Sequence, residues 1–503
     1  MATEEKNKIK HNVIFGVFNQ ILIFAIGLIV PRFILTSYGS EINGLLTTLT
    51  QIFTYVGLLE AGIGNASLNA LYKPLAESNF DEASYVFSAT QKYFRKVTYV
   101  YFICVIIIAI VYPMCIECEL NYVQLFFVIL FQGLSGALTF FFIAAYKQIL
   151  AADGRNYIVS NISLIIYVFT SAVKLILMSL GFNVVVLQAG YLFVHCTQII
   201  IFIFVMRRKY PWLKKHNKPN MKVLSQRKAF LIHELSGTVF SSTDAFVLST
   251  FCNLMLTSVY SIYNMVFLAL NSLINSVNSG LHYILGQAYA KGKDEYIKIH
   301  DIYDSLYMTL VFSLFSVVYI LICPFVRLYT EGITDIAYVD YLLPLLFVSI
   351  QLLSCGRATS ARLISIAGHA KATQWRSLIE AGINLSLSIV LANMIGIYGV
   401  LLGTIIALLY RSNDIIIYAN LKILKRSPWK TYSKILSNLM MFMLFVIIEW
   451  FLRDYIKNTC TSIFSFVLYG ILITFISFSL YASIAVIGNV KIRKMMLKRM
   501  KSL

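Results

Sequence analysis

The chain is a succession of apolar stretches of roughly 20 residues separated by short polar gaps. An α-helix of that length crosses the hydrocarbon core of a bilayer, which is about 30 Å thick. The pattern therefore predicts an all-α integral membrane protein with about fourteen spans. The expected spans cover residues 12–36, 43–70, 97–115, 122–146, 156–180, 183–206, 229–252, 256–285, 302–326, 341–366, 375–396, 398–420, 433–452 and 463–488.

Lys and Arg residues gather in alternate gaps. Most of the 42 basic residues follow this rule, and only Arg327, Arg453 and Lys457 fall on the opposite set of gaps. Positive charge accumulates on cytoplasmic loops, so we expect both termini in the cytoplasm. The charged segment Met1–Lys10 precedes an apolar stretch too long for a signal peptide, which predicts a retained anchor.

Composition agrees with a membrane protein. The chain is 59% hydrophobic and 13% charged, and its mean hydropathy of +0.75 is too high for a soluble core. The net charge of +19 reflects the basic cytoplasmic loops, so membrane lipids are expected partners and nucleic acid is not. The longest outer gap, around Thr330–Asp340, is too short for a catalytic domain. Phosphate-loop, nucleophile-elbow and HExxH motifs are absent, so we expect a protein that is not an enzyme and needs no cofactor.

An internal repeat organises the chain. The segment Arg32–Glu82 aligns with Ala245–Glu295 at a constant offset of 213 residues, and Gly154 aligns with Gly368 at an offset of 214. We therefore predict two lobes of six spans each in parallel orientation, followed by two extra spans. Such halves are typical of transporters, because rocking one against the other exposes a central site alternately to each side. The expected domains are residues 1–206 (N-terminal lobe), 207–228 (basic cytoplasmic linker), 229–420 (C-terminal lobe) and 421–503 (two spans and a basic tail).

Polar residues form a stripe along the span predicted at 256–285. Its members fall within about 60° of one another on an α-helix. They are Asn264, Asn271, Asn275, Asn278 and His282, and the repeat places Gln51, Asn65 and Asn69 on the corresponding face of span 43–70. Amides offer donors and acceptors without charge, which suits sugar hydroxyls in an aqueous cleft. The alternative is hydrogen bonding between packed helices, the ordinary use of intramembrane Asn.

Basic residues within the spans are candidate ligands for an anion. Burying such a side chain at the bilayer centre costs about 2.5–3.5 kcal/mol, so it usually faces a cavity or a partner. Lys174 and Arg357 lie deepest and are the stronger candidates for binding a diphosphate. Arg32 and Arg362 are further candidates, although each lies close enough to a span end to reach the interface.

Two acidic residues are candidates for coupling to an ion. Glu60 lies among small residues in Glu60–Gly64, and Asp244 lies in the span predicted at 229–252. Either could bind H⁺ or Na⁺ when a cavity opens, or could form a fixed ion pair with a base on a neighbouring span. Cys115 and Cys118 form a CxxC on a predicted outer gap, where a disulfide is chemically feasible. No second Cys pair or nearby His completes a metal site.

Several local patterns resemble the Wzx-type O-antigen and polysaccharide flippases of the MATE-like MOP exporter superfamily. They occur in the family's order across roughly residues 12–420, and the last two spans match only in number. The patterns are Pro31-Arg32 with Tyr38–Leu45, Glu60–Gly64, His233-Glu234 with Ser241–Asp244 and Val259–Tyr263, and Ala367–His369 with Thr373–Arg376, Ile383–Ile389 and Gly399–Thr404.

The resemblance implies a function. Proteins of this type are thought to move undecaprenyl-diphosphate-linked oligosaccharides across the bacterial cytoplasmic membrane for O-antigen, lipopolysaccharide or capsule synthesis. In these proteins two lobes are thought to enclose a cationic cleft. Counter-transport of a cation is thought to drive the transport cycle. The lipid-linked oligosaccharide is then the expected substrate, with a polysaccharide polymerase and a chain-length protein as partners in the same inner membrane. The alternatives are a MATE-type drug exporter, a peptidoglycan-precursor flippase and, less favoured, a membrane polymerase.

Overall fold

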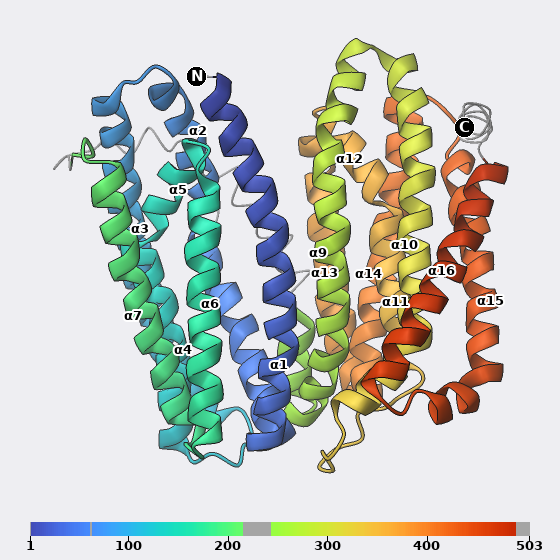
Figure 1. Cartoon of the computed structure of the whole chain (residues 1–503), viewed down its shortest axis with the longest axis horizontal. Coiled ribbons are helices and arrows are strands. Elements are labelled where there is room, and N and C mark those ends of the chain that lie inside the picture. The colour runs from blue at the N-terminus through green and yellow to red at the C-terminus, as the bar shows by residue number, and fades with distance from the viewer. Residues whose placement is uncertain (1, 61–62, 215–242, 489–503) are drawn as a thin grey trace. The chain divides into compact units, whose positions relative to one another are not determined.

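The computed structural model describes residues 2–60, 63–214 and 243–488, and for some helical residues, chiefly 2–21 and 276–284, only the backbone. Every regular element in these ranges is a helix, as predicted (Figure 1). Twelve of the described helices are long and apolar enough to cross a membrane. The predicted span 12–36 and residues 43–57 of the next one form a single helix, whereas residues 63–70 belong to a separate helix. Most of the span predicted at 229–252 lies outside the described residues.

The chain packs into two compact units, unit 1 (Met1–Ser258) and unit 2 (Val259–Leu503). Helices of unit 1 are drawn in blue to green in Figure 1. They are α1 (Ala2–Gly57), η1 (Leu58–Glu60), α2 (Ile63–Ala76), α3 (Phe80–Val111), η2 (Tyr112–Met114), α4 (Tyr122–Phe142), α5 (Ala144–Ala152), α6 (Asn156–Ser179) and α7 (Val184–Lys209).

Helices of unit 2 run from yellow-green to red in Figure 1. The first of them, α9, begins five residues before Val259, so its residues 254–258 still belong to unit 1. They are α9 (Leu254–Lys291), α10 (Lys293–Tyr329), α11 (Leu343–Gly356), α12 (Ala358–Ile366), α13 (Ala370–Ile395), α14 (Ile397–Tyr418), the π-helix η4 (Ala419–Leu424), α15 (Trp429–Thr459) and α16 (Ile463–Gly488).

A sharp bend in α1 joins the first two predicted spans. Gly39 has a φ of 81°, a backbone conformation that residues with a Cβ rarely adopt. Beyond the bend, the amide of Asn43 donates to the hydroxyl of Ser258 over 2.7 Å. A Cβ on Gly44 would lie 1.8 Å from the carbonyl oxygen of Leu254, so only glycine permits this approach of α1 to the start of α9. Within Tyr38–Leu45, local packing therefore accounts for Gly39, Asn43 and Gly44.

Helix ends repeat between the two units at the predicted offset. A break at Ile143 separates α4 from α5, and a break at Arg357, 214 positions later, separates α11 from α12. Gly154 and Gly368 both have positive φ, at 71° and 74°, and each lies between a short helix and a long one. The parallel internal repeat is therefore present in the backbone as well as in the sequence.

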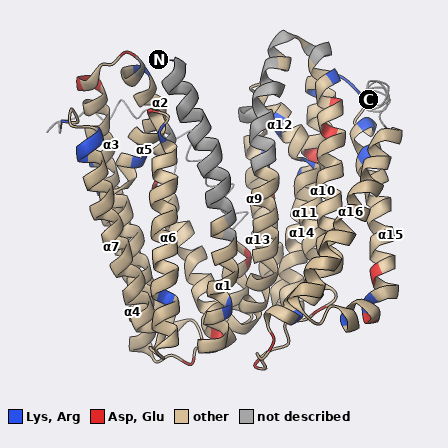
Figure 2. Cartoon of the chain, viewed as in Figure 1, with Lys and Arg blue, Asp and Glu red and all other residues tan. Residues whose placement is uncertain are grey.

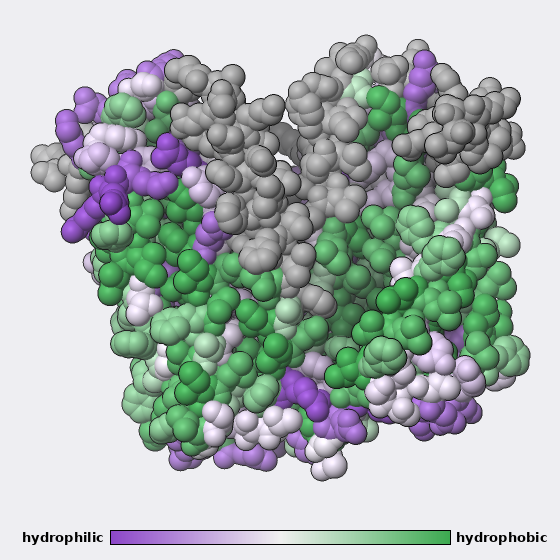
Figure 3. Space-filling model, viewed as in Figure 1, coloured by the Kyte–Doolittle hydropathy of each residue, from purple (hydrophilic) through white to green (hydrophobic). Residues whose placement is uncertain are grey.

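The two extra helices, α15 and α16, pack onto α10. The hydroxyls of Tyr481 and Ser316 lie 2.8 Å apart, and Ser477 donates to the carbonyl of Ser313 over 3.1 Å. The opposite face of α16 is apolar and open, with Phe464 80% and Phe475 73% exposed. Figure 3 shows green apolar surface on both units between hydrophilic ends, as expected for helices that contact lipid.

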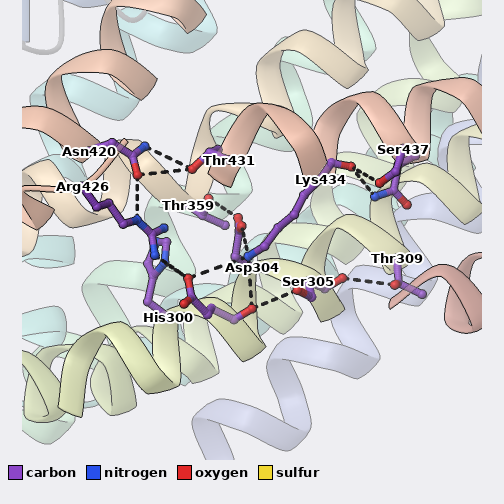
Figure 4. Close-up of polar contacts among 12 residues, drawn as sticks. His300, Asp304, Ser305, Thr309, Thr359, Asn420, Arg426, Thr431, Lys434 and Ser437 are labelled. Carbon is purple, nitrogen blue, oxygen red and sulfur yellow. Dashed lines mark hydrogen bonds and ion pairs between the residues drawn. The ribbon is translucent and has the colours of Figure 1, made fainter. Parts of the chain in front are cut away.

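Charged residues in each unit gather near the helix ends (Figure 2). One cluster of charged side chains joins α10 to η4 and α15 (Figure 4). Lys434 pairs with buried Asp304 at 2.8 Å, Arg426 pairs with Asp301 at 2.6 Å, and Thr359 donates to Asp304. Because Asp304 is fully buried, the pair with Lys434 compensates a charge that would otherwise be costly there.

The CxxC pair lies in the loop between η2 and α4, and both thiols are free. Cys115 is exposed, whereas burial and the neighbouring Glu41 raise the pKa of the half-buried Cys118 to about 12. A raised pKa keeps the thiol protonated and unreactive at neutral pH.

This difference between the two thiols is testable. In variants that keep only one cysteine, a membrane-impermeant maleimide at pH 8 should label Cys115 in intact cells. Cys118 should stay unlabelled until the protein is denatured, because roughly one in ten thousand of its thiols is ionised at that pH. Labelling of Cys115 only in inverted vesicles would contradict the predicted orientation, and a Cys115–Cys118 disulfide detected by mass spectrometry would contradict the assignment of free thiols.

Candidate functional site

A half-open cavity of about 460 Å³ with several polar groups in its wall lies in unit 1. It is lined by residues of α1, α4, α5, α6 and α7, and Gly27 and Pro31 of α1 form part of its wall. Three basic side chains line it, namely Lys147, Lys174 and His195. Hydroxyl groups supply most of the remaining polar lining, from Thr139, Ser163, Tyr167, Thr170, Ser171 and Tyr191.

Lys174, a candidate selected from the sequence, lies on α6 and lines this cavity. Its ammonium group lies 4.8 Å from the centre of the Tyr191 ring, a cation–π contact. No carboxylate belongs to the described lining of the cavity. An intramembrane ammonium that contacts an aromatic ring and no carboxylate among the described residues is expected to attract an anion.

Lys147 and His195 complete the basic wall and were not selected from the sequence. Lys147 lies on α5 and His195 on α7, where its ring packs 4.4 Å from that of Tyr191. Lys147 is one residue past the predicted end of span 122–146, but α5 continues to Ala152. The apolar residues after Lys147 were the signal that could have placed it within a helix.

Two polar atoms in the cavity wall have no hydrogen-bond partner among the described residues. They are the hydroxyl oxygen of Thr170 and Nδ1 of His195, both buried. Buried polar atoms are nearly always hydrogen-bonded, so unsatisfied ones in a cavity indicate space for water or a ligand. Two ammonium groups, an imidazole and several hydroxyls together suit an anionic group with many acceptor oxygens, such as a phosphate or diphosphate.

Arg357 occupies a different polar cluster, in unit 2. It lies at the break between α11 and α12, and its Nη1 donates to Oε1 of Glu380 over 2.6 Å. Glu380 also lies 3.6 Å from Arg411. Arg411 and Arg376 both pair with Asp414, so the cluster holds three guanidinium groups and two carboxylates. Arg411 lies inside a predicted span, yet it was overlooked when intramembrane bases were selected.

The other selected bases lie apart from these two clusters. Arg362 donates from Nη1 to the hydroxyl of Tyr303 over 3.0 Å, which joins α12 to α10. Arg32 is half-buried on α1, next to the cavity residue Pro31. A role for Arg32, Arg357 or Arg362 in substrate binding stays a prediction.

The predicted Asn stripe is described only in part. Asn271 donates to the side-chain oxygen of Gln351 over 2.8 Å, a hydrogen bond between α9 and α11 that matches the packing alternative. Asn264 is half-buried and Asn275 is exposed. In unit 1, Gln51 is half-buried and Asn69 is exposed. The side chains of Asn65, Asn278 and His282 lie outside the described residues.

Both acidic candidates lie in unit 1. Glu60 ends η1 and interacts electrostatically with Lys147 of the cavity wall. Asp244 is buried at 9% exposure and lies near Tyr55, whose hydroxyl is 2.6 Å from that of Thr243. Within the described ranges, no group of three or more His, Cys, Asp and Glu side chains could hold a metal ion.

The fold is that of solved MOP-superfamily transporters. Lipid II flippase MurJ in an inward closed conformation has a TM-score of 0.69 at 15% identity, over 94% of this chain and 97% of that one. An inward-facing multidrug resistance MATE family transporter has a TM-score of 0.63 at 12% identity, over 82% of this chain and 99% of that one. A MOP superfamily transporter from Pyrococcus furiosus, described as having a binding pocket of reverse polarity, has a TM-score of 0.58 at 12% identity. The match covers 84% of this chain and 97% of that one.

These likenesses define the architecture. At such low identity they show that the chain has the fold of this superfamily, with two helical units and two further helices. No protein-family model and no curated protein sequence matches the chain. The fold and the twelve apolar helices therefore show a multi-pass membrane architecture.

Proposed function

We propose that this protein is a Wzx-type flippase, which moves a polyprenyl-diphosphate-linked oligosaccharide from one leaflet of the bacterial cytoplasmic membrane to the other. The observation that carries the proposal is the unit 1 cavity, with Lys147, Lys174 and His195 in its wall and no carboxylate in its described lining. Support for transport in general comes from the fold, whose solved examples include a lipid II flippase and multidrug transporters.

The chemistry of the cavity favours a lipid diphosphate. Phosphate oxygens accept charge-assisted hydrogen bonds from ammonium groups and an ordinary one from the hydroxyl of Thr170. A cationic drug would be repelled by the same wall, which argues against the drug-exporter alternative. A peptidoglycan-precursor flippase remains the second candidate, because lipid II flippase MurJ has the same fold over 94% of this chain.

The proposed cycle is alternating access. A sugar head group cannot cross hydrocarbon alone, because each unpaired hydroxyl costs roughly 4–8 kcal/mol there. The protein would shield the head group while the polyprenyl tail stays in lipid, and movement of the two halves would change the side that is open. We propose H⁺ or Na⁺ as the coupling ion with Glu60 or Asp244 as its site, and a polysaccharide polymerase and a chain-length protein as membrane partners.

Deletion and complementation test the proposal. Deleting the gene in its own host should leave lipid-linked repeat units inaccessible to a reagent added outside the cell, and the wild-type gene should restore access. A change in drug susceptibility with unaltered access would favour the exporter. Arrest of peptidoglycan synthesis, with surface polysaccharide intact, would favour the peptidoglycan-precursor flippase.

A further inference from the structure

The three basic residues that break the charge pattern of the sequence line one cavity in unit 2. Arg327, Arg453 and Lys457 are the residues on the opposite set of gaps, and all three border a cavity of about 330 Å³. Its wall comes from the last turns of α10 and α15, together with Val339 and Tyr341 before α11. Three outliers in one place indicate a local need for positive charge.

Two of these side chains are held in place by the protein. Arg453 donates from Nε and Nη2 to the Glu449 carboxylate, both over 3.0 Å, and its guanidinium lies 4.1 Å from the centre of the Tyr341 ring. Arg327 donates from Nη2 to the carbonyl of Cys460 over 2.6 Å. Each guanidinium has five N–H donors, so further donors remain on both.

The cavity has a positive balance. Lys457 is exposed at its edge, and Glu449 is the single carboxylate in its described lining. Among the lining residues, three cations against one carboxylate leave two positive charges, while two carboxylates outside the lining, Asp340 and Asp454, act electrostatically on Cys323 and Tyr341 of the wall. A site of this kind attracts a group with one or two negative charges.

The cavity lies at the ends of α10 and α15 that are remote from the Asp304 cluster of Figure 4. Asp304 and Arg327 are separated by about 35 Å along α10, at 1.5 Å per residue. On α15, Lys434 contacts Asp304, while Arg453 lies roughly 30 Å further along by the same rise. These distances match a hydrocarbon core, so the cavity lies at the level of lipid phosphates on the opposite membrane surface.

The surface of α15 beside the cavity is apolar and aromatic. Trp450, Phe451 and Tyr455 are 64%, 71% and 59% exposed. Trp and Tyr concentrate at membrane interfaces, where their rings contact both acyl chains and head groups. A molecule that places a phosphate in the cavity could therefore lay its hydrocarbon along this face.

We propose that this cavity binds the phosphate of an anionic phospholipid in the leaflet opposite the basic loops. A cavity of about 330 Å³ accommodates a small head group, whereas an oligosaccharide is much larger. Arg327, Arg453 and Lys457 supply the charge, and the exposed face of α15 contacts the acyl chains. The proposal concerns α10 and α15 and holds whatever substrate the protein transports.

Native mass spectrometry of the full chain tests the proposal. Protein released from nanodiscs should retain phosphatidylglycerol and not phosphatidylcholine. A basic residue near the membrane surface contributes about 1 kcal/mol to anionic lipid binding, so Lys457→Gln should weaken phosphatidylglycerol binding about fivefold and Arg327→Gln/Lys457→Gln about 30-fold. Lys457→Arg should restore it.

The matched control is Lys430→Gln, which removes an exposed lysine at the other end of α15 and should leave binding unchanged. Arg453 is left intact, because its loss would leave Glu449 buried without its partner. Equal phosphatidylglycerol retention by wild type and the double variant would overturn the proposal. Retention of undecaprenyl diphosphate at this site in preference to phosphatidylglycerol would also overturn it, since the occupant would then be the carrier lipid.

Discussion

Replacing Lys174 with methionine should reduce transport at least tenfold while leaving the amount of folded protein unchanged. A hydrogen bond to a charged group contributes about 1.5–3 kcal/mol, which corresponds to a loss of roughly 10-fold to 150-fold in binding of the anionic head group. Stability should not fall, because the described lining of the cavity holds no carboxylate that depends on Lys174. The measurement is access to lipid-linked repeat units from outside, normalised to protein in the membrane.

The controls for this prediction separate charge from packing. Lys174→Arg keeps the positive charge and should retain part of the activity, whereas Lys174→Met keeps the length of the side chain and removes the charge. Lys422→Met, an exposed lysine of η4 in unit 2, is the matched control and should leave transport unchanged. A melting temperature that drops by several degrees in Lys174→Met, with loss of protein, would show that Lys174 has a structural role.

Replacing Glu380 with alanine should have the largest effect on stability. Glu380 is 6% exposed and compensates both Arg357 and Arg411. Its loss removes one of the two carboxylates of the cluster, and removing one partner of a buried ion pair costs about 3–5 kcal/mol. We expect little folded protein in the membrane, and a lower melting temperature for what can be purified.

The double variant Glu380→Ala/Arg357→Ala provides the internal control. It also removes a cation, so it should recover part of the stability lost in Glu380→Ala. Arg357→Ala alone should be milder, because Glu380 keeps Arg411 as a neighbour. If Glu380→Ala is as stable as wild type yet inactive, the cluster belongs to the transport site, and the assignment of a structural ion pair is wrong.

Two of the sequence predictions that depend on regular patterns are confirmed. Apolar stretches of membrane-spanning length became helices, because a backbone in lipid must satisfy its own hydrogen bonds. The repeat offset of 214 reappeared in the breaks at Ile143 and Arg357, since equivalent sequences break their helices at equivalent places. The substrate, the coupling ion and the roles of the Asn stripe stay predictions.

Predictions for single polar residues were less complete. Lys174 lines the unit 1 cavity, and its role in substrate binding stays a prediction, while Lys147 and His195 beside it were missed. Arg357 was selected for the same chemistry, yet it pairs with Glu380, a residue that the sequence analysis did not consider. An isolated intramembrane charge signals that a partner or a cavity exists and does not say which.

The sequence by itself determined the membrane architecture, because span length, charge alternation and the repeat are properties of order along the chain. Only the tertiary structure decided which charges are compensated. Lys147, Lys174 and His195 meet in one cavity because three helices bring them together, and Arg357 meets Glu380 because α11 and α13 do the same. Burial and partner choice depend on these distances between helices, which the one-dimensional pattern does not contain.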